Sequence, residues 1–248
     1  MKNQFFFGQP SSLEYDLVLD MFAGTKINSS RTSSIPLSQF WKDSDSKLSM
    51  LLCKVSNNLG FVKDTSLCFE YPTKPQLGKG KASMTDLMIL CGSYKIAIEA
   101  KFTEYAKARH VQKIENWLRS GDNPENRKLV LDYWKSQIKN FSYGLLTENM
   151  DDIDYQFFHR TASACHKTKN ACVVYQVFYD DDTKKYVDDY IEELKKYVRL
   201  INPNEGLRYL VWKIETQQLI EDKEKYPFEL MKTQEVYRFG KNELFEIR

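Results

Sequence analysis

The sequence lacks several features that would mark common classes of protein. Its 36 lysines and arginines nearly balance 34 aspartates and glutamates, so no large net charge draws the whole molecule to nucleic acid or to an anionic membrane. No stretch approaches a membrane span, and the first eight residues hold only three consecutive apolar ones, too few for a signal-peptide core. We therefore expect a soluble cytoplasmic protein with no membrane partner, in which any contact with nucleic acid is a local basic patch.

Cysteine and histidine are scarce and scattered. The five cysteines form no Cys-x-x-Cys pair, and most stand inside apolar runs, as Cys53 and Cys68 do. This pattern predicts buried, reduced thiols and argues against a zinc or iron–sulfur centre. The three histidines are too dispersed to indicate a histidine-bound metal, and the chain has no Gly-x-x-x-x-Gly-Lys-Ser/Thr loop that would bind the phosphates of ATP.

Hydrophobic periodicity divides the chain into helices and strands. Helices are expected over residues 11–22 (opened by a capping box at Ser11 to Glu14), 38–58, 103–119, 124–147, 154–167 and 183–200. Strands are expected over residues 65–71, 86–91, 94–101, 171–179 and 206–215, with a terminal hairpin over 234–247 that turns at Gly240. Strands interleaved with helices predict an α/β fold, a mixed β-sheet flanked by helices, in a single domain over residues 1–248.

The two strands at residues 86–101 carry the clearest chemical signal. Gly92-Ser93 is a favourable two-residue hairpin connection, and with this turn the facing residues have numbers that sum to 185. Asp86 then lies opposite Glu99, and strand alternation places Lys101 on the same face. Two acids and a lysine are therefore expected to converge at the end of the hairpin far from its turn.

Facing acids in an apolar hairpin require compensation. Like charges opposite one another destabilise a sheet, and burying carboxylates costs more still. A divalent cation removes both penalties, and Mg²⁺ suits the arrangement because it takes carboxylate and carbonyl oxygens while keeping waters and substrate phosphate as further ligands. The alternative is that Glu99 and Lys101 form an ordinary surface ion pair on an edge strand. The apolar flanks of both strands favour the metal site.

These residues resemble the PD-(D/E)xK nuclease superfamily, whose core hairpin carries an acid on one strand and (D/E)-x-K on the next. The match is Thr85-Asp86-Leu87-Met88-Ile89 followed by Ile96-Ala97-Ile98-Glu99-Ala100-Lys101, with Thr85 at the proline position. The resemblance implies a restriction-endonuclease-like core over about residues 60–180, between N-terminal helices and a C-terminal α/β extension. It also implies Mg²⁺ held by Asp86, Glu99 and the carbonyl of Ala100, with Lys101 orienting or activating water.

Three further residues are candidates for the same site, each with a structural alternative. Glu70, on the strand before the hairpin, is either a further metal ligand or water-positioning group, or an exposed strand acid. Glu14 resembles the first-helix acid that many members aim at the metal, but its place in the capping box explains it without function. Gln137 begins a run similar to the Gln-x-x-x-Tyr motif of the RecB-like and lambda-exonuclease branch, with Phe141 replacing tyrosine. It also fits a plain core helix.

Basic residues flank the proposed metal site on both sides in sequence. Lys74, Lys79 and Lys81 lie in a flexible Gly/Pro-rich loop before the Asp86 strand, and Lys107 and Arg109 follow Lys101. Such side chains can follow a phosphate backbone, although solvated loops and helix faces often have the same composition.

Together these patterns predict a Mg²⁺-dependent nuclease that hydrolyses phosphodiester bonds of DNA in restriction, phage defence or repair, with Mn²⁺ able to substitute. RNA as the substrate, a homodimer and a partner protein all stay open. The alternative is a catalytically inactive nucleic-acid-binding or scaffold protein of the same fold.

Overall fold

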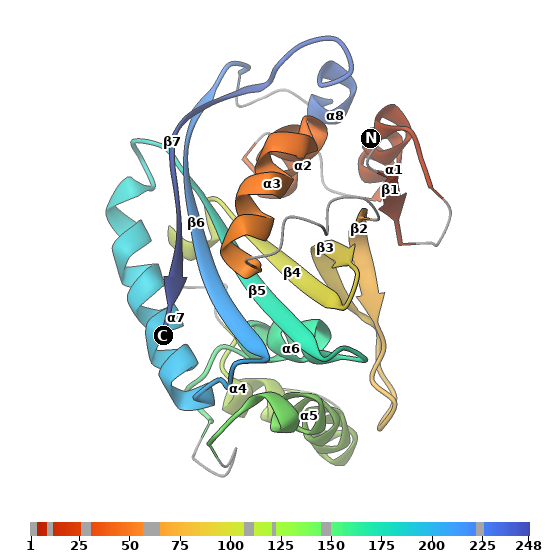
Figure 1. The fold of residues 1–248 in the computed structure, drawn as a ribbon, viewed down its shortest axis with the longest axis vertical. Helices are drawn as coiled ribbons and strands as arrows, with labels where there is room; N and C mark the ends of the chain where they lie inside the picture. Colours follow the sequence, from red (N-terminus) through yellow and green to blue (C-terminus); the bar gives the residue numbers. More distant parts are fainter. Residues whose placement is uncertain are drawn as a thin grey trace.

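The computed structural model describes residues 4–8, 12–25, 31–56, 65–106, 112–120, 123–144, 150–221 and 226–248. Seven strands form one mixed sheet in which the order in space follows the order in the chain (Figure 1). The strands are β1 (Gln4–Phe7), β2 (Thr65–Thr73), β3 (Ser83–Cys91), β4 (Tyr94–Lys101), β5 (Asn170–Tyr179), β6 (Leu207–Gln218) and β7 (Tyr237–Ile247). The β1–β2, β4–β5 and β5–β6 pairs are parallel and the other three are antiparallel, so the sheet is mixed, as predicted.

Helices cover both faces of the sheet. They are α1 (Tyr15–Thr25), α2 (Ser34–Lys42), α3 (Ser44–Val55), α4 (Ile114–Arg119), α5 (Pro124–Ile138), α6 (Tyr155–Cys165), α7 (Val187–Ile201) and α8 (Pro227–Leu230), with 3₁₀ turns at Glu104–Ala106, Lys139–Phe141 and Lys184–Tyr186. In Figure 1, α2 and α3 cross in front of the sheet, whereas α6 lies behind β5. No helix in the described ranges is long and apolar enough to cross a membrane.

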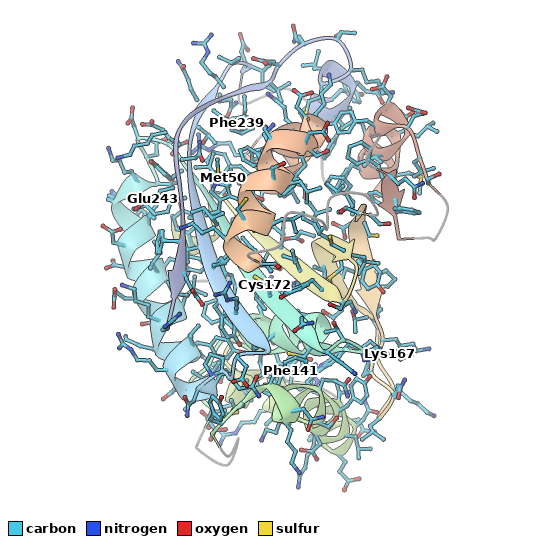
Figure 2. All side chains as sticks on the ribbon, in the orientation of Figure 1. Met50, Phe141, Lys167, Cys172, Phe239 and Glu243 are labelled. Carbon is cyan, nitrogen blue, oxygen red and sulfur yellow. The ribbon has the colours of Figure 1, made fainter. Side chains whose placement is uncertain are left out.

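Each face of the sheet packs its own apolar core. One core joins residues of α1, α2, α3 and α8 to sheet residues such as Ile96, Ile98 and Cys172. The other joins α4, α5, α6 and α7 to residues of the opposite face, such as Ala97 and Val173. Figure 2 shows Cys172 in the middle of the sheet and Glu243 on the edge strand β7; Cys172 is fully buried and Glu243 is exposed. Helices on both faces keep the central strands out of water.

Local sequence signals explain where several helices begin and end. The side chain of Asn123 accepts a hydrogen bond from the amide of Asn126 and Pro124 follows at the first helical position, which starts α5. Asp154 caps α6 in the same way, by accepting from the amide of Gln156. Helix α7 ends at Asn202, whose φ of +47° lies in the left-handed region that stops a helix.

The N-terminal helices differ from the sequence prediction. Helix α1 begins at Tyr15, and the backbone oxygen of Glu14 accepts from the amides of Leu17 and Val18, so Glu14 itself precedes the first turn and the predicted capping box does not start the helix. Ser11 lies outside the described residues. The single helix expected over 38–58 is two helices that meet at Asp43.

The cysteines largely follow the prediction. All five are free thiols and four are buried. Cys53, on the outer side of α3, is exposed, because its apolar sequence neighbours belong to an amphipathic helix that buries only one face.

The C-terminal prediction is wrong in one element. Residues Tyr237–Ile247 form one long strand paired with β6, not a hairpin. The register shifts between Ile214 and Thr216, and Gly240 and Lys241 lie opposite this irregularity. A Cβ on Gly240 would come within 2.7 Å of Oε2 of Glu215, and that carboxylate accepts a bond from the amide of Lys241. The Gly240-Lys241-Asn242 run therefore marks a β-bulge. Bulges and hairpin turns use the same residue types, which is why the sequence pattern predicts a hairpin here.

Candidate active site

The hairpin of β3 and β4 has the register that the sequence predicts. Cys91 pairs with Tyr94, Ile89 with Ile96 and Leu87 with Ile98, each pair summing to 185. Gly92 has a φ of +55°, the positive value that a glycine supplies at the first central position of this turn. The strands Thr65–Thr73 and Tyr94–Lys101 also begin and end close to their predicted bounds.

The regular pleat of β3 ends at Asp86. Leu87 packs in the core on the α2 and α3 side, yet Thr85, two residues before it, accepts a hydrogen bond from Arg160 of α6 on the other face. Residues two apart in a regular strand share a face, so β3 is irregular at this point. Asp86 and Glu99 therefore do not form the next regular pair. Instead Oδ2 of Asp86 accepts the backbone amide of Ala100 at 2.8 Å.

Glu70 adjoins Asp86 from the neighbouring strand. The pairs Phe69 with Leu87 and Tyr71 with Thr85 leave Glu70 and Asp86 between them. Glu70 has a φ of +49°, an uncommon backbone conformation for a residue with a side chain, and it is only 8% exposed. The alternative of an exposed strand acid is thus wrong for Glu70. Three acids occupy neighbouring positions on β2, β3 and β4.

Asp86 is the carboxyl with excess negative charge around it. Burial is the largest cause that raises its pKa, and the carboxylates of Glu99 and Glu70 raise it further, against the opposing effects of Arg160 and Lys101. The half-buried Asp86 therefore holds a proton more firmly than an ordinary aspartate.

Glu99 has the opposite electrostatic environment. Its side chain is buried, and burial alone would raise its pKa, but Arg160 and Lys101 together hold the pKa well below its usual range. Nε of Arg160 donates to Oε2, while Nζ of Lys101 (2.8 Å) and Nε2 of Gln156 donate to Oε1. Glu99 is a fixed carboxylate in which Oε1 accepts two hydrogen bonds and Oε2 accepts one, so Oε2 keeps one acceptor position for a cation.

Lys101 is held as a cation beside these acids. Its Nζ donates to Oε1 of Glu99 at 2.8 Å and to Oε1 of Gln156 at 2.7 Å. The residue as a whole is 9% exposed. Burial lowers the pKa of Lys101, but Glu99 and Asp86 outweigh burial and raise it, so the ammonium stays charged at neutral pH. Asp86, Glu99 and Lys101 thus lie together at the end of the hairpin, as predicted, but the predicted pairing of Asp86 directly opposite Glu99 is wrong, because Asp86 accepts from the amide of Ala100 instead.

Two residues of the site were missed by the sequence reasoning. Gln156 and Arg160 both come from α6 and both bind Glu99. These two polar residues are four apart in a helix whose other residues include buried Phe, Ala and Thr, so they lie on one face of it. This spacing is the sequence signal that could have identified them. His159 lies between Gln156 and Arg160 in the same helix. Burial and the positive charge of Arg160 lower its pKa to about 3, so its imidazole is neutral at neutral pH and adds no charge to the site.

Two predicted candidates are not brought to this site. Glu14 is exposed and lines a separate groove with Lys42 and Asp45. Oε1 of Gln137 lies 3.0 Å from Nδ1 of His166, whose backbone oxygen accepts from Lys95 at the opposite end of β4 from Lys101. Six residues of extended strand separate these ends, roughly 20 Å. Gln137, the first residue of the run that resembles Gln-x-x-x-Tyr, therefore lies in α5 near the Lys95 end of β4, away from the candidate site.

The predicted phosphate-binding residues are partly described. Lys74, Lys79 and Lys81 are exposed in the connection from β2 to β3. This connection is anchored rather than loose, because the backbone amide and oxygen of Lys79 bond to the side chain of Asn126 on α5, each at 2.6 Å. Lys107 and Arg109 lie outside the described residues.

A metal ion has one suitable place in this arrangement. Among the described residues no three His, Cys, Asp or Glu side chains already form a metal-binding group, and Arg160 and Lys101 supply the positive charge that Glu99 needs. The negative charge of Glu99 is therefore balanced within the protein and does not by itself require a bound metal ion. On the Asp86 side, however, the carboxylates of Glu99 and Glu70 raise the pKa of Asp86, and the amide of Ala100 donates to Asp86, so the Ala100 carbonyl is directed to the same side of β4. These oxygen donors fit a hard cation such as Mg²⁺.

The comparisons with known proteins place the chain in a family without an assigned activity. A family model described as a domain of unknown function, DUF6946, matches residues 10–221, so the chain belongs to this family. No curated protein and no solved structure matches the chain.

Proposed function

We propose that the chain is a Mg²⁺-dependent nuclease of the PD-(D/E)xK type, with a restriction-endonuclease-like core, that hydrolyses phosphodiester bonds of DNA. The observation that carries the proposal is the meeting of Asp86, Glu99 and Lys101 at the end of one hairpin, with Glu70 beside them. Carboxylates brought this close together raise the pKa of Asp86 and so cost the fold stability when they are ionised. Sites that retain such groups are candidates for catalysis.

The residues of the site have separable roles. Mg²⁺, held by Asp86, Glu99 and the carbonyl of Ala100, would polarise the phosphodiester and make a bound water more acidic. Lys101 uses two of its three N–H groups on Glu99 and Gln156, which leaves one, as far as the described residues go, for an attacking water or a phosphate oxygen.

Neighbouring side chains keep these groups in place. Arg160 fixes the orientation of Glu99 and is itself held by Thr85, and Gln156 bridges Lys101 and Glu99. Glu70 adjoins Asp86 and raises its pKa, and a cation bound to Asp86 would offset this repulsion. Lys74, Lys79 and Lys81, in the connection that enters β3, would contact the phosphate backbone.

One observation favours the second candidate, a nucleic-acid-binding or scaffold protein of the same fold without nuclease activity. Arg160 and Lys101 already neutralise Glu99, so the ion cluster is satisfied within the chain. A cluster of this kind can be purely structural. This candidate predicts binding of DNA that is indifferent to Mg²⁺ and to substitution of Asp86.

A substrate panel separates the two candidates. Linear duplex, circular duplex and single-stranded DNA, and RNA, are incubated with Mg²⁺ or Mn²⁺ and with wild type or Asp86→Asn. The nuclease predicts metal-dependent cleavage of at least one DNA by wild type and none by Asp86→Asn, because the asparagine amide keeps an acceptor for the Ala100 amide but lacks the charge. Cleavage that persists in Asp86→Asn, or no metal-dependent cleavage by wild type, would contradict the proposal.

A further inference from the structure

A cavity of ≈ 560 Å³ opens beside Lys101 and Gln156, on the α6 and α7 side of the sheet. It shares these two residues with the proposed active site, so a ligand in the cavity lies next to the reacting groups. The remaining walls come from the 3₁₀ turn at Glu104–Ala106, Lys113 before α4, the start of α6, and the Tyr186 to Glu193 part of α7.

The walls of this cavity are largely aromatic. Tyr105, Phe157, Tyr186 and Tyr190 line it. The rings of Tyr105 and Tyr190 lie 5.5 Å apart and 30° from parallel, and Phe157 packs edge-on against Tyr190. Tyr186 is 37% exposed at the surface. Flat apolar walls of this kind bind the face of a planar ring.

The charged groups that line the cavity are mainly acidic, with Glu104, Asp154, Asp189 and Glu193 against Lys101 and Lys113. Asp189 and Glu193 of α7 are exposed and line the cavity together with Asp154. These carboxylates repel an anion but accept hydrogen bonds from the amino groups of a base. The hydroxyl oxygen of Tyr190 is buried and finds no hydrogen-bond partner in the part of the chain that the structure describes. The ring of Tyr190 therefore lines the cavity, while its hydroxyl is buried behind the wall.

We infer that the cavity lined by Tyr105, Tyr186 and Tyr190 is a binding site for one unstacked nucleobase, next to the phosphate that Lys101 contacts. The inference deepens the proposed nuclease function and rests on it, since Lys101 and Gln156 join the cavity to the reacting groups. Aromatic walls hold the base face, and the acidic groups accept from its exocyclic amine.

This site has a consequence for the substrate class. A base reaches the cavity only when it is unpaired and unstacked. Unpairing and unstacking a base of a duplex costs a few kcal/mol of free energy, whereas a base in a single strand is already unpaired. Single-stranded DNA, or a strand with unpaired nucleotides at the cleavage point, is therefore the preferred substrate, and amino-bearing bases such as cytosine bind better than a nucleotide without a base.

The test measures binding without cleavage. The affinities of a twelve-nucleotide oligodeoxycytidine and of a fully abasic oligomer with the same phosphates are measured by fluorescence anisotropy in EDTA. Wild type, Tyr186→Ala and the matched control Tyr143→Ala are compared; Tyr143 is a surface tyrosine, 68% exposed, that does not line this cavity. Thermal melting confirms that each variant is folded.

We expect wild type to bind the cytidine oligomer roughly tenfold or more tightly than the abasic oligomer, the size of one base–aromatic stack. Tyr186→Ala is expected to lose most of this difference, and Tyr143→Ala to keep it. Equal affinities of wild type for the two oligomers would overturn the inference, as would equal effects of the two tyrosine substitutions.

Cleavage, measured separately with Mg²⁺, distinguishes the two proposals. Base-dependent binding without cleavage would refute the nuclease and retain the nucleobase site. Cleavage with base-independent binding would refute the nucleobase site alone.

Discussion

Replacing Asp86 by asparagine is expected to stabilise the protein and abolish its activity. The folded protein raises the pKa of Asp86 through burial and through the carboxylates of Glu99 and Glu70. A group whose pKa is higher in the folded than in the unfolded state favours folding most when protonated. As the pH rises from the pKa of the unfolded state, near 4, through the pKa of the folded state, Asp86 ionises and the free energy of unfolding falls.

The magnitude follows from this electrostatic cost. The folded protein raises the pKa of Asp86 to about 7, and one pKa unit corresponds to about 1.4 kcal/mol, which sets an upper limit of roughly 4 kcal/mol. Because Asp86 is only half-buried, solvent screens part of this cost, and removing the charge at pH 8 should raise the free energy of unfolding by about 1–3 kcal/mol. The asparagine side chain retains an acceptor for the amide of Ala100, so that hydrogen bond is not lost. For a chain of this length the gain corresponds to an increase of about 3–10 °C in Tm.

Thermal melting at several pH values checks this prediction. The difference in Tm between Asp86→Asn and wild type should be largest at pH 8 and should shrink toward pH 4, because the wild-type carboxyl is then protonated. Added Mg²⁺ should raise the Tm of wild type and not that of the variant, since a ligand stabilises only a folded state that binds it. A variant less stable than wild type at pH 8, or a difference independent of pH, would refute the electrostatic account of Asp86.

Two further predictions concern the groups around the site. Arg160→Met leaves the buried carboxylate of Glu99 short of a partner and should cost about 3–5 kcal/mol in urea unfolding, whereas Arg119→Met, which breaks an exposed pair with Glu115, should cost less than about 0.5 kcal/mol; equal costs would contradict the assigned burial. Replacing Lys74, Lys79 and Lys81 together by glutamine should lower the salt dependence of binding to single-stranded DNA by about 2 in the log–log slope, while the exposed lysines Lys54, Lys196 and Lys241 serve as the matched set; the same slope in both triple variants would exclude the phosphate role.

The sequence predicts the hairpin well because its determinants are local. Gly92 supplies the turn, and the alternation of Ile96, Ala97 and Ile98 fixes which side chains face which core. A one-residue shift would move every apolar side chain to the wrong face, so register follows from the pattern. The register brings Asp86 to the end of the hairpin that carries Glu99 and Lys101, although Asp86 itself lies beyond the last regular pair.

The rest of the site depends on tertiary packing that no local pattern encodes. Arg160 and Gln156 meet Glu99 across nearly sixty residues of chain, and the break in the pleat at Asp86 reflects the irregular backbone of Glu70 on the next strand. Helix α1 shows the same limit. The apolar spacing of residues 11–22 favours a buried stripe of Leu13, Leu17, Val18 and Met21. Of these Val18 is fully buried, whereas Leu17 and Met21 are 49% and 44% exposed, because Val18 packs together with Leu19 and Phe22.

The most direct test of the nuclease compares two buried lysines of one strand. Lys101 and Lys95 lie on the same face of β4, at opposite ends, and both are less than a tenth exposed. Cleavage of single-stranded DNA is measured as a function of Mg²⁺ concentration for wild type, Lys101→Met and Lys95→Met, each shown to be folded by its melting curve. The account predicts metal-dependent cleavage by wild type and Lys95→Met and none by Lys101→Met. Equal cleavage by the two variants, or none by wild type at any Mg²⁺ concentration, would contradict it.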